Sequence, residues 1–306
     1  MVNDLKVAIL IPTLNAGKDW LKVLESVNEQ ATKFCSKIIV DSGSRDDTVV
    51  LAKQFGFTVK EISKSEFNHG ATRQLLSDLA EGADICVFLT QDAILASPDS
   101  VKNLAKVFND PKIGMAYGRQ LPHVNAKPLE IHARLFNYPA TSHVIGLEDQ
   151  VRLGFKAFFC SDSFSAYRKS ALEQIGGFPL TCIMGEDAIV AAKMLKANYK
   201  KAYVAEATVH HSHSYTLAEE YCRYFDTRVF HEQNIWMLNE YGKPTGEGFK
   251  FIRSELSYVL KNSPASLFKS VTSIFAKWLG YNSGRIYKKL PNAVIKKLSM
   301  HSFYWK

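Results

Sequence analysis

The sequence predicts an α/β fold, with a mainly parallel central sheet flanked by helices and a helical appendage at the C-terminal end. In the first half, apolar runs of strand length alternate with segments whose apolar residues recur at helical spacing, a pattern typical of βαβ units. The last third instead carries basic amphipathic segments. We therefore expect an α/β domain over residues 1–215 and a helical, basic amphipathic region over residues 216–306.

Four strands are expected within residues 1–90. Each is a short apolar run, separated from the next by a helical pattern or a polar turn. Pro12 is expected to end the first strand, because proline has no N–H for a ladder hydrogen bond. Trp20, Leu24 and Val27 mark the first helix by their spacing, and a helix over 71–80 precedes the fourth strand. The expected strands are 6–11, 37–40, 57–62 and 85–89.

The second half alternates less regularly. Strands are expected at 113–118, 157–159 and 203–211, and a helix begins at Glu186. Residues 120–156 form a mixed region with helical patches and no clear chemistry. A long helix rich in aromatic residues is expected from Leu217 to about Tyr241.

Polar clusters follow three of the predicted strands, at residues 12–15, 41–47 and 90–92. In open parallel sheets, ligands bind beyond the carboxyl ends of the strands, so we expect these clusters to converge on one crevice. None of the clusters reads GxGxxG or GxxxxGK[ST]. This argues against an NAD-binding domain and against a P-loop nucleotide hydrolase.

Charge is distributed unevenly along the 306 residues, whose formal net charge is +8. Residues 250–306 hold 11 Lys and Arg and a single acid, Glu255, whereas the other 249 residues carry 27 bases and 29 acids. The basicity therefore belongs to the tail. The 46% hydrophobic content excludes a disordered chain.

The cysteines and the N-terminal segment indicate a cytosolic protein. Five Cys are scattered without a CxxC pair, which suggests reduced thiols and neither a zinc site nor a disulfide framework. The first apolar run lacks the basic region and cleavage site of a signal peptide. No uninterrupted apolar stretch reaches the length of a transmembrane helix.

Five motifs occur in a characteristic order: VAILIPTLN, IIVDSGSRDDT, FLTQD, GGFP and GED. In this order they resemble the inverting family 2 glycosyltransferases, which have the Rossmann-like GT-A fold, and the resemblance covers about residues 6–215. The stretches FNHGATRQLL, TQDA, HSHSYT and GYNSGRIYKKLP are further similar to bacterial rhamnosyltransferases. The resemblance implies transfer of L-rhamnose from dTDP-β-L-rhamnose, with inversion, to a saccharide or lipid-linked saccharide of cell-surface polysaccharide such as O-antigen.

The resemblance implies a nucleotide site made by the first two clusters. Pro12, Thr13 and Asn15 occupy the loop where the family binds the nucleoside. Asp41 matches an aspartate that accepts a hydrogen bond from the pyrimidine N3–H, a donor that thymine has and cytosine lacks. From the residues alone, Asp41 and Asn15 also fit ordinary turn chemistry.

Arg73 is the residue that the resemblance assigns to the diphosphate. It lies at the start of the helix predicted over 71–80, and a guanidinium donates two parallel hydrogen bonds to phosphate oxygens. The family's usual neighbour asparagine is Gln74 here. A surface arginine is the alternative.

Thr90, Gln91 and Asp92 occupy the place of the family's DxD metal motif. A leaving diphosphate requires a cation because charge builds on it as the glycosidic bond breaks. Only the final carboxylate, Asp92, is present, so the requirement for Mg²⁺ or Mn²⁺ stays open. In the family a histidine after the last strand completes the site, and both His211 and His213 are candidates. Packing is the alternative for each.

Glu186 and Asp187 match the family's acidic pair. The resemblance makes Asp187 the general base that takes the proton of the acceptor hydroxyl and Glu186 its neighbour. The alternative is a pair of helix-start carboxylates stabilised by the helix dipole. Asp162 lies where the acceptor loop is expected, and His69 is a candidate contact for the sugar or phosphate.

The tail predicts amphipathic helices with basic residues and aromatic side chains. Such segments lie on anionic membrane surfaces, which would suit a lipid-linked acceptor and a peripheral position on the inner face of a bacterial membrane. A packed appendage or a homodimer contact is the alternative, and the regular apolar faces argue against nucleic acid. The faces comprise Ile252, Leu256, Val259 and Leu260 in one segment and Leu267, Val271, Ile274, Phe275, Trp278 and Leu279 in the next.

Two other functions remain open at this point. One is a family 2 enzyme that uses another UDP- or dTDP-sugar. The other is a catalytically silent relative that binds nucleotide or glycan within a membrane assembly, which the missing first carboxylate at Thr90 favours and the intact Glu186–Asp187 pair opposes.

Overall fold

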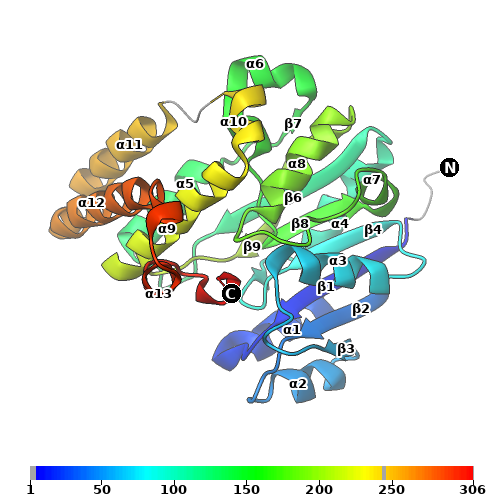
Figure 1. Ribbon diagram of the computed structural model, residues 1–306. Helices are drawn as coiled ribbons and strands as arrows, with labels where there is room; N and C mark the ends of the chain where they lie inside the picture. Colours follow the sequence, from blue (N-terminus) through cyan, green and yellow to red (C-terminus); the bar gives the residue numbers. More distant parts are fainter. Residues whose placement is uncertain (1–4, 243–245, 306) are drawn as a thin grey trace.

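The computed structural model describes residues 5–242 and 246–305. A 9-stranded sheet runs through the molecule in the order β3-β2-β1-β4-β8-β6-β9-β5, with β7 paired to β9 and helices on both faces (Figure 1). The strands are β1 Val7–Thr13, β2 Phe34–Asp41, β3 Thr58–Glu61, β4 Ile85–Leu89, β5 Ile94–Leu95, β6 Ile113–Leu121, β7 His143–Ile145, β8 Phe164–Arg168 and β9 Lys200–His210. The α-helices are α1 Trp20–Asn28, α2 Thr48–Gln54, α3 His69–Leu79, α4 Ser100–Lys106, α5 Pro128–Asn137, α6 Gln150–Leu153, α7 Lys169–Gln174, α8 Glu186–Lys196, α9 Leu217–Gln233, α10 Ile235–Tyr241, α11 Glu247–Asn262, α12 Leu267–Gly284 and α13 Asn292–Leu298.

The α/β class is confirmed, but the sheet is mixed. Strands β1 to β4 pair with one another in parallel, as predicted. Strand β8 runs antiparallel between β4 and β6. Its first residue therefore pairs with the last residue of β4 (Phe164 with Leu89). This brings the loop before β8, which carries Asp162, to the edge where the parallel strands end.

Strand β1 continues through Pro12, where the sequence predicted its end. The Thr13 carbonyl accepts a hydrogen bond from the Ser42 amide, so the backbone N–H and C=O of Thr13 face β2. The backbone groups of Pro12, one residue earlier, face the opposite side, toward β4. On that side the pairing with β4 ends at Leu10. The missing N–H of Pro12 therefore costs no ladder hydrogen bond.

Two further predictions of elements were wrong. Residues 157–159, predicted as a strand, fall mostly in a 3₁₀ helix over Gly154–Phe158, because a short apolar run buries equally well in either conformation. The long helix predicted to Tyr241 breaks at Asn234, whose side chain donates to the Phe230 carbonyl. An asparagine side chain competes in this way with the helix's own hydrogen bonds.

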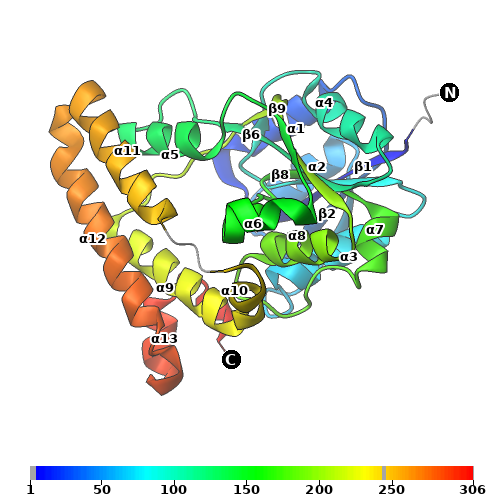
Figure 2. The same cartoon turned by 90° about the horizontal axis from the view of Figure 1, so that it is seen from above.

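Alternate residues of β1 enter different hydrophobic cores on the two faces of the sheet. Ala8 and Leu10 pack with residues of α3 and α8, and Val7 and Ile9 pack with residues of α1 and α4. Residues of α9 belong to the same core as α3 and α8. The C-terminal helices thus pack directly on the body, with α11 and α12 outermost (Figure 2). No helix within the described part of the chain is both long and apolar enough to cross a membrane.

The GGFP motif docks onto the start of α3. Gln74 Oε1 accepts a hydrogen bond from the Phe178 amide at 2.8 Å. A Cβ atom on Gly70 would lie 1.9 Å from the Pro179 carbonyl oxygen. Only glycine permits this approach. The motif therefore fixes α3, and with it Arg73, against the segment that leads into α8.

We expect Gly70→Ala to lower the free energy of unfolding by about 1–3 kcal/mol, because the added methyl group must displace backbone. Gly248→Ala is a matched control, since Gly248 is also the second residue of a helix but has open space around its Cα. It should be neutral or slightly stabilising. Urea unfolding of both variants measures the difference, and equal stability of Gly70→Ala and the parent would show that the α3 contact is not tight.

Candidate active site

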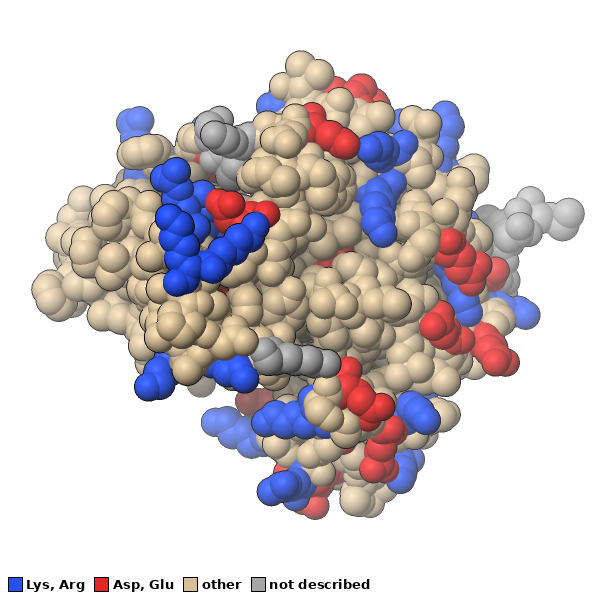
Figure 3. All heavy atoms as spheres, viewed as in Figure 1, with Lys and Arg blue, Asp and Glu red and all other residues tan. Residues whose placement is uncertain are grey.

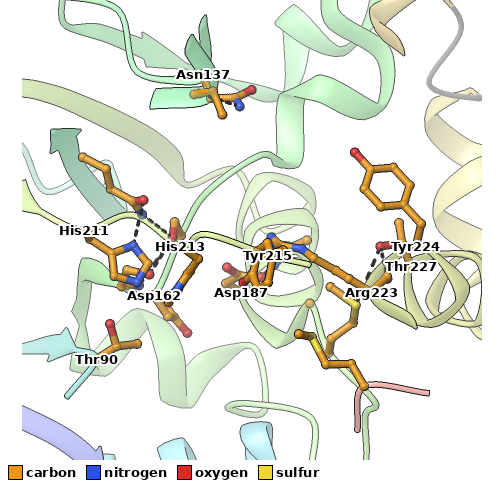
Figure 4. Close-up of a pocket in the computed structure, with 18 of the residues that line it drawn as sticks. Thr90, Asn137, Asp162, Asp187, His211, His213, Tyr215, Arg223, Tyr224 and Thr227 are labelled. Carbon is orange, nitrogen blue, oxygen red and sulfur yellow. Dashed lines mark hydrogen bonds between the residues drawn. The ribbon is translucent and has the colours of Figure 1, made fainter. Parts of the chain in front are cut away.

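A cavity of about 1090 Å³ opens at the carboxyl ends of β1 and β4 and continues between α5, α8 and α9. It brings together most of the site residues predicted from the sequence, and Figure 4 shows part of it. Asn15 and Asp41 lie outside its lining. The predicted residues that line it are Pro12, Thr13, His69, Arg73, Gln91, Asp92, Asp162, Glu186, Asp187, His211 and His213.

Asp41 organises the loop beside the cavity. The side chain is 1% exposed. Its Oδ1 accepts from Thr13 Oγ1 at 2.9 Å and from Ser44 Oγ at 2.6 Å, and its Oδ2 accepts from the Gly43 and Ser44 amides. The carboxylate thus shapes residues 42–44, of which Ser42 lines the cavity. Its predicted contact with the base stays a prediction.

Asn15 and Gln91 hold the loop after β1. Asn15 is exposed and has a positive φ of 45°, and its Oδ1 accepts from the Arg45 amide at 2.8 Å. Gln91 accepts from the Leu14 amide at 2.7 Å and donates to the Leu14 carbonyl at 3.1 Å. These contacts tie the end of β4 to the end of β1. They give Gln91 a structural role in addition to its place in the cavity wall.

Arg73 lies between two buried carboxylates. Its Nε is 2.9 Å from Asp162 Oδ2, and its Nη1 is 2.8 Å from Glu186 Oε1. Burial opposes the charged form, but Glu186 and Asp162 raise the pKa of Arg73. Two of its nitrogens are therefore engaged by protein carboxylates. The diphosphate contact predicted for Arg73 stays a prediction, and in the structure Arg73 pairs with Asp162 and Glu186.

Asp187 is the free member of the acidic pair. Helix α8 begins at Glu186, just after Gly185, whose φ of 75° favours glycine. Asp187 Oδ1 accepts from the Ala188 amide at 2.7 Å, and Asp187 forms no ion pair with any described residue. Burial, followed by Glu186 and Asp162, raises the pKa of Asp187. A carboxylate of this kind, facing a cavity, can accept a proton.

Asp92, His211 and His213 form a second group, here called the Asp92–histidine group. Each offers one ligand atom, and these atoms lie within 4.8 Å of one another. His211 Nε2 is 3.5 Å from Asp92 Oδ1, and His213 Nε2 is 3.7 Å from Asp92 Oδ2. Both histidines named by the sequence therefore face the aspartate. The side chains of Asp162, Asp187 and both histidines enter the same space (Figure 4).

Gln120 orients His211. The His211 Nδ1 lies 3.0 Å from Gln120 Oε1. Because an amide oxygen only accepts, this contact places a proton on Nδ1 and leaves Nε2 to face Asp92. Burial lowers the pKa of His213 to about 4, with His211 contributing. The His213 ring is therefore neutral near pH 7, which is the form that ligates metals.

The structure adds residues that sequence reasoning missed. Arg134 on α5, Tyr215 after β9 and Arg223 on α9 line the cavity, as does His301 near the C-terminal end. Asp226 anchors that end, because its Oδ2 accepts from the Met300 and His301 amides at 2.9 and 3.1 Å. Tyr215 belongs to the HSHSYT stretch and had a signal. Arg134 lies in the mixed region 120–156, Arg223 and Asp226 lie in a segment whose pattern shows only a helix, and no sequence signal singled out His301.

Two curated proteins are similar to the chain over nearly its whole length. The O-antigen chain rhamnosyltransferase RfbN of Salmonella typhimurium is 46% identical over 302 residues, which cover 98% of this chain and 96% of the relative. The O-antigen chain rhamnosyltransferase WbaN of Salmonella anatum is 43% identical over 298 residues, covering 97% of this chain and 95% of the relative.

Solved structures with a similar fold include a mannosyltransferase and S. aureus TarS. The mannosyltransferase PcManGT from Pyrobaculum calidifontis, solved with GDP-Man and Mn²⁺, has a TM-score of 0.65 at 15% identity and covers 94% of this chain and 88% of its own. Residues 1–349 of S. aureus TarS have a TM-score of 0.57 at 15% identity and cover 96% of this chain and 83% of that one. At this identity they show the fold, which is GT-A as the sequence predicted.

The sequence profile described as glycosyl transferase family 2 matches residues 8–176. This span includes the three polar clusters at the ends of β1, β2 and β4 as well as Arg73 and Asp162. Together with the two relatives that match nearly the whole chain, this match confirms the family predicted from the five motifs. The chain is a glycosyltransferase and belongs to glycosyl transferase family 2.

Proposed function

We propose that the enzyme transfers L-rhamnose from dTDP-β-L-rhamnose to a saccharide or lipid-linked saccharide acceptor in O-antigen synthesis, with inversion. Similarity to two O-antigen chain rhamnosyltransferases over nearly the whole chain supports the sugar and the pathway. The observation that carries the mechanism is Asp187, a carboxylate in the cavity wall that no described cation pairs with.

In the proposed reaction, Asp187 takes the proton of the acceptor hydroxyl. The hydroxyl oxygen forms the new bond to C1 of the sugar, and the bond from C1 to the donor diphosphate breaks with its electrons leaving on the phosphate oxygen. Attack from the face opposite the leaving group inverts the configuration at C1 and gives an α-linked product. Arg73 keeps Glu186 turned away from the acceptor and leaves Asp187 as the base.

We propose that the Asp92–histidine group holds Mg²⁺ or Mn²⁺. The donor set fits, because one carboxylate oxygen and two imidazole nitrogens converge and Gln120 orients one of the rings. A divalent cation there would supply positive charge to the departing diphosphate. The remaining positions would be filled by phosphate oxygens and water.

The outward face of α12 supports attachment to an anionic membrane. Here the helix packs inward through small residues: a Cβ on Gly280 would lie 2.2 Å from the Tyr221 carbonyl oxygen, and Ser270 and Ser273 are buried. The opposite side of the helix, called the α12 outer face, is apolar and exposed. It comprises Phe268 81%, Val271 52%, Phe275 60%, Trp278 59% and Leu279 41% exposed.

Charge around this face is positive. The one acid of residues 250–306, Glu255, is 1% exposed and accepts a hydrogen bond from Ser270. Exposed Lys261, Arg285 and Lys289 lie near the ends of α12, and the end of the molecule built by α11 and α12 shows few acids in Figure 3. An apolar face bordered by bases is suited to an anionic bilayer. We propose that it holds the enzyme on the inner membrane face beside a lipid-linked acceptor.

Other functions compete less well with these observations. A UDP-sugar is compatible with the same cavity, so donor identity rests on similarity and needs a direct test. A catalytically silent relative would not require an unpaired carboxylate at the position of the proposed base. Asp187 is present at that position and lines the cavity.

A donor screen with purified enzyme tests the proposal. Nucleotide release and product formation would be measured with dTDP-rhamnose, UDP-glucose, UDP-galactose and UDP-GlcNAc, each with Mn²⁺, Mg²⁺ or a chelator. We expect turnover with dTDP-rhamnose, an α-linkage in the product by NMR, and suppression by the chelator. Turnover with only a UDP-hexose would overturn the donor, and full activity with the chelator would overturn the role of the cation.

Asp187→Asn should lower kcat by about a hundredfold or more, because the amide cannot take the acceptor proton. Affinity for dTDP, measured by calorimetry, should stay within about twofold of the parent. Asp99→Asn is the matched control, since Asp99 is an exposed carboxylate at the start of α4. Retained turnover in Asp187→Asn would rule out Asp187 as the base.

Vesicle sedimentation tests the α12 outer face. We expect the enzyme to bind vesicles containing phosphatidylglycerol and to bind phosphatidylcholine vesicles weakly. Phe275→Glu with Trp278→Glu should reduce binding by about tenfold or more, whereas Val50→Glu, which changes an exposed valine on α2, should not. If the double variant instead converts a dimer into a monomer in sedimentation velocity, the face is a subunit contact and the membrane proposal fails.

A further inference from the structure

Two arginines of the cavity lack an acidic partner. Arg134 projects from α5 and Arg223 from α9, and both line the cavity. Across residues 5–242 and 246–305, neither guanidinium forms an ion pair, whereas Arg73 in the same cavity forms two. Glu220, another lining residue, is paired with Lys277 at 3.4 Å. The cavity thus holds two positive charges that the described protein does not balance by direct contact.

Both arginines are held by neutral groups. Arg134 Nη1 donates to Gln120 Oε1, its guanidinium lies 5.7 Å from the Tyr138 ring centroid, and its buried Nε has no partner. Arg223 Nη1 donates to the Tyr215 hydroxyl at 2.8 Å, and its guanidinium lies 5.1 Å from that ring. Each side chain is oriented while several N–H donors stay open. For Arg134, burial without a counter-ion disfavours the charged form and lowers its pKa, a cost that a bound anion would offset.

Their neighbours place both arginines beside the Asp92–histidine group. Gln120 Oε1, which accepts from Arg134, also contacts His211 Nδ1. The Tyr215 ring, which holds Arg223, lies 5.4 Å from the ring of His213. In Figure 4 the Arg223 side chain extends from α9 toward Tyr215 and Asp187. In addition to burial, Arg223 lowers the pKa of Arg134, so the two cations affect each other.

We propose that Arg134 and Arg223 form a binding site for a diphosphate group. This inference rests on the proposed function, because that reaction provides two sources of diphosphate: the nucleotide of the donor and the lipid link of an acceptor. Two planar guanidinium groups with open donors fit the oxygens of adjacent phosphates. Unlike Arg73, whose predicted phosphate contact is untested, these two arginines form no ion pair with a described carboxylate.

The test compares Arg134→Gln, Arg223→Gln and the double variant with Arg253→Gln, an exposed arginine on α11. Calorimetry would measure binding of inorganic pyrophosphate, dTDP and thymidine. If the donor is the source, pyrophosphate and dTDP should bind about tenfold or more weakly in each cavity variant, with thymidine unchanged. Arg223→Lys should recover part of the loss, because it retains the charge without the planar fork.

Kinetics distinguish the second source. If the diphosphate belongs to the acceptor, dTDP affinity should stay unchanged while KM rises about tenfold for a diphosphate-linked acceptor and not for the same saccharide without phosphate. Unchanged pyrophosphate and dTDP affinities together with unchanged KM values would overturn the proposal. Pyrophosphate binding needs no rhamnose, so an error in the donor sugar would leave this result intact.

Thermal unfolding of the ligand-free variants separates binding from a structural role. Arg134→Gln should leave Tm unchanged or raise it, because burial disfavours the charged form of Arg134, and Arg223→Gln should change Tm little. The proposal would be contradicted if Tm fell strongly in both single variants while the folded protein still bound pyrophosphate as tightly as the parent does. The same tight binding would then be expected in Arg223→Lys. That result would show that the arginines serve packing.

Discussion

The ion pairs of Arg73 with Asp162 and Glu186 are the interaction on which the site depends. Three segments meet there: α3, the loop before β8 and the start of α8. All three side chains are at most 7% exposed. Removal of one partner from a buried pair leaves an uncompensated charge and costs about 3–5 kcal/mol. The geometry of this part of the cavity wall is thus coupled to the stability of the fold.

The same interaction separates the roles of two adjacent carboxylates. Glu186 and Asp187 are consecutive at the start of α8, and consecutive helical residues point in different directions. Arg73 takes Glu186 on one side, and Asp187 turns to the cavity. Burial and two neighbouring carboxylates raise the pKa of Asp187, which makes it a stronger base once it is ionised. If Asp187 is the base, as we propose, like charges that are held close together prepare it for proton transfer.

The sequence predicts those parts of the molecule whose local pattern and tertiary role agree. Strand β4 was predicted to the residue, and the clusters after β1, β2 and β4 meet as expected because parallel strands end at one edge. The direction of β8 depends on where a strand inserts, which local periodicity does not contain. Arg134 was missed because α5 lies in an irregular region, and only its position against Gln120 gives it a role.

The helices of the tail show a further limit of pattern reading. Their apolar faces were predicted, and either packing or membrane contact was left open. In α12 the glycines and serines settle which side packs, because they allow the helix to approach the backbone of α9. An apolar stripe on a helix normally faces a core. In α12 the side with small residues packs on α9 instead, and the large apolar side chains face outward. Size, rather than hydrophobicity alone, determines the orientation of this helix.

The division of the chain at residue 215 follows the order of the elements but does not divide the site. Tyr215 and Arg223 follow the last strand, and residues 300–303 return to the cavity, where His301 lies 3.4 Å from His69. Asp226, on α9, holds that returning segment through two amide hydrogen bonds. Helix α12, whose outer face is apolar, therefore packs on α9, and α9 in turn contributes to the wall of the cavity. Under the membrane attachment that we propose, contact at α12 would bring this cavity to the same boundary as a lipid-linked acceptor.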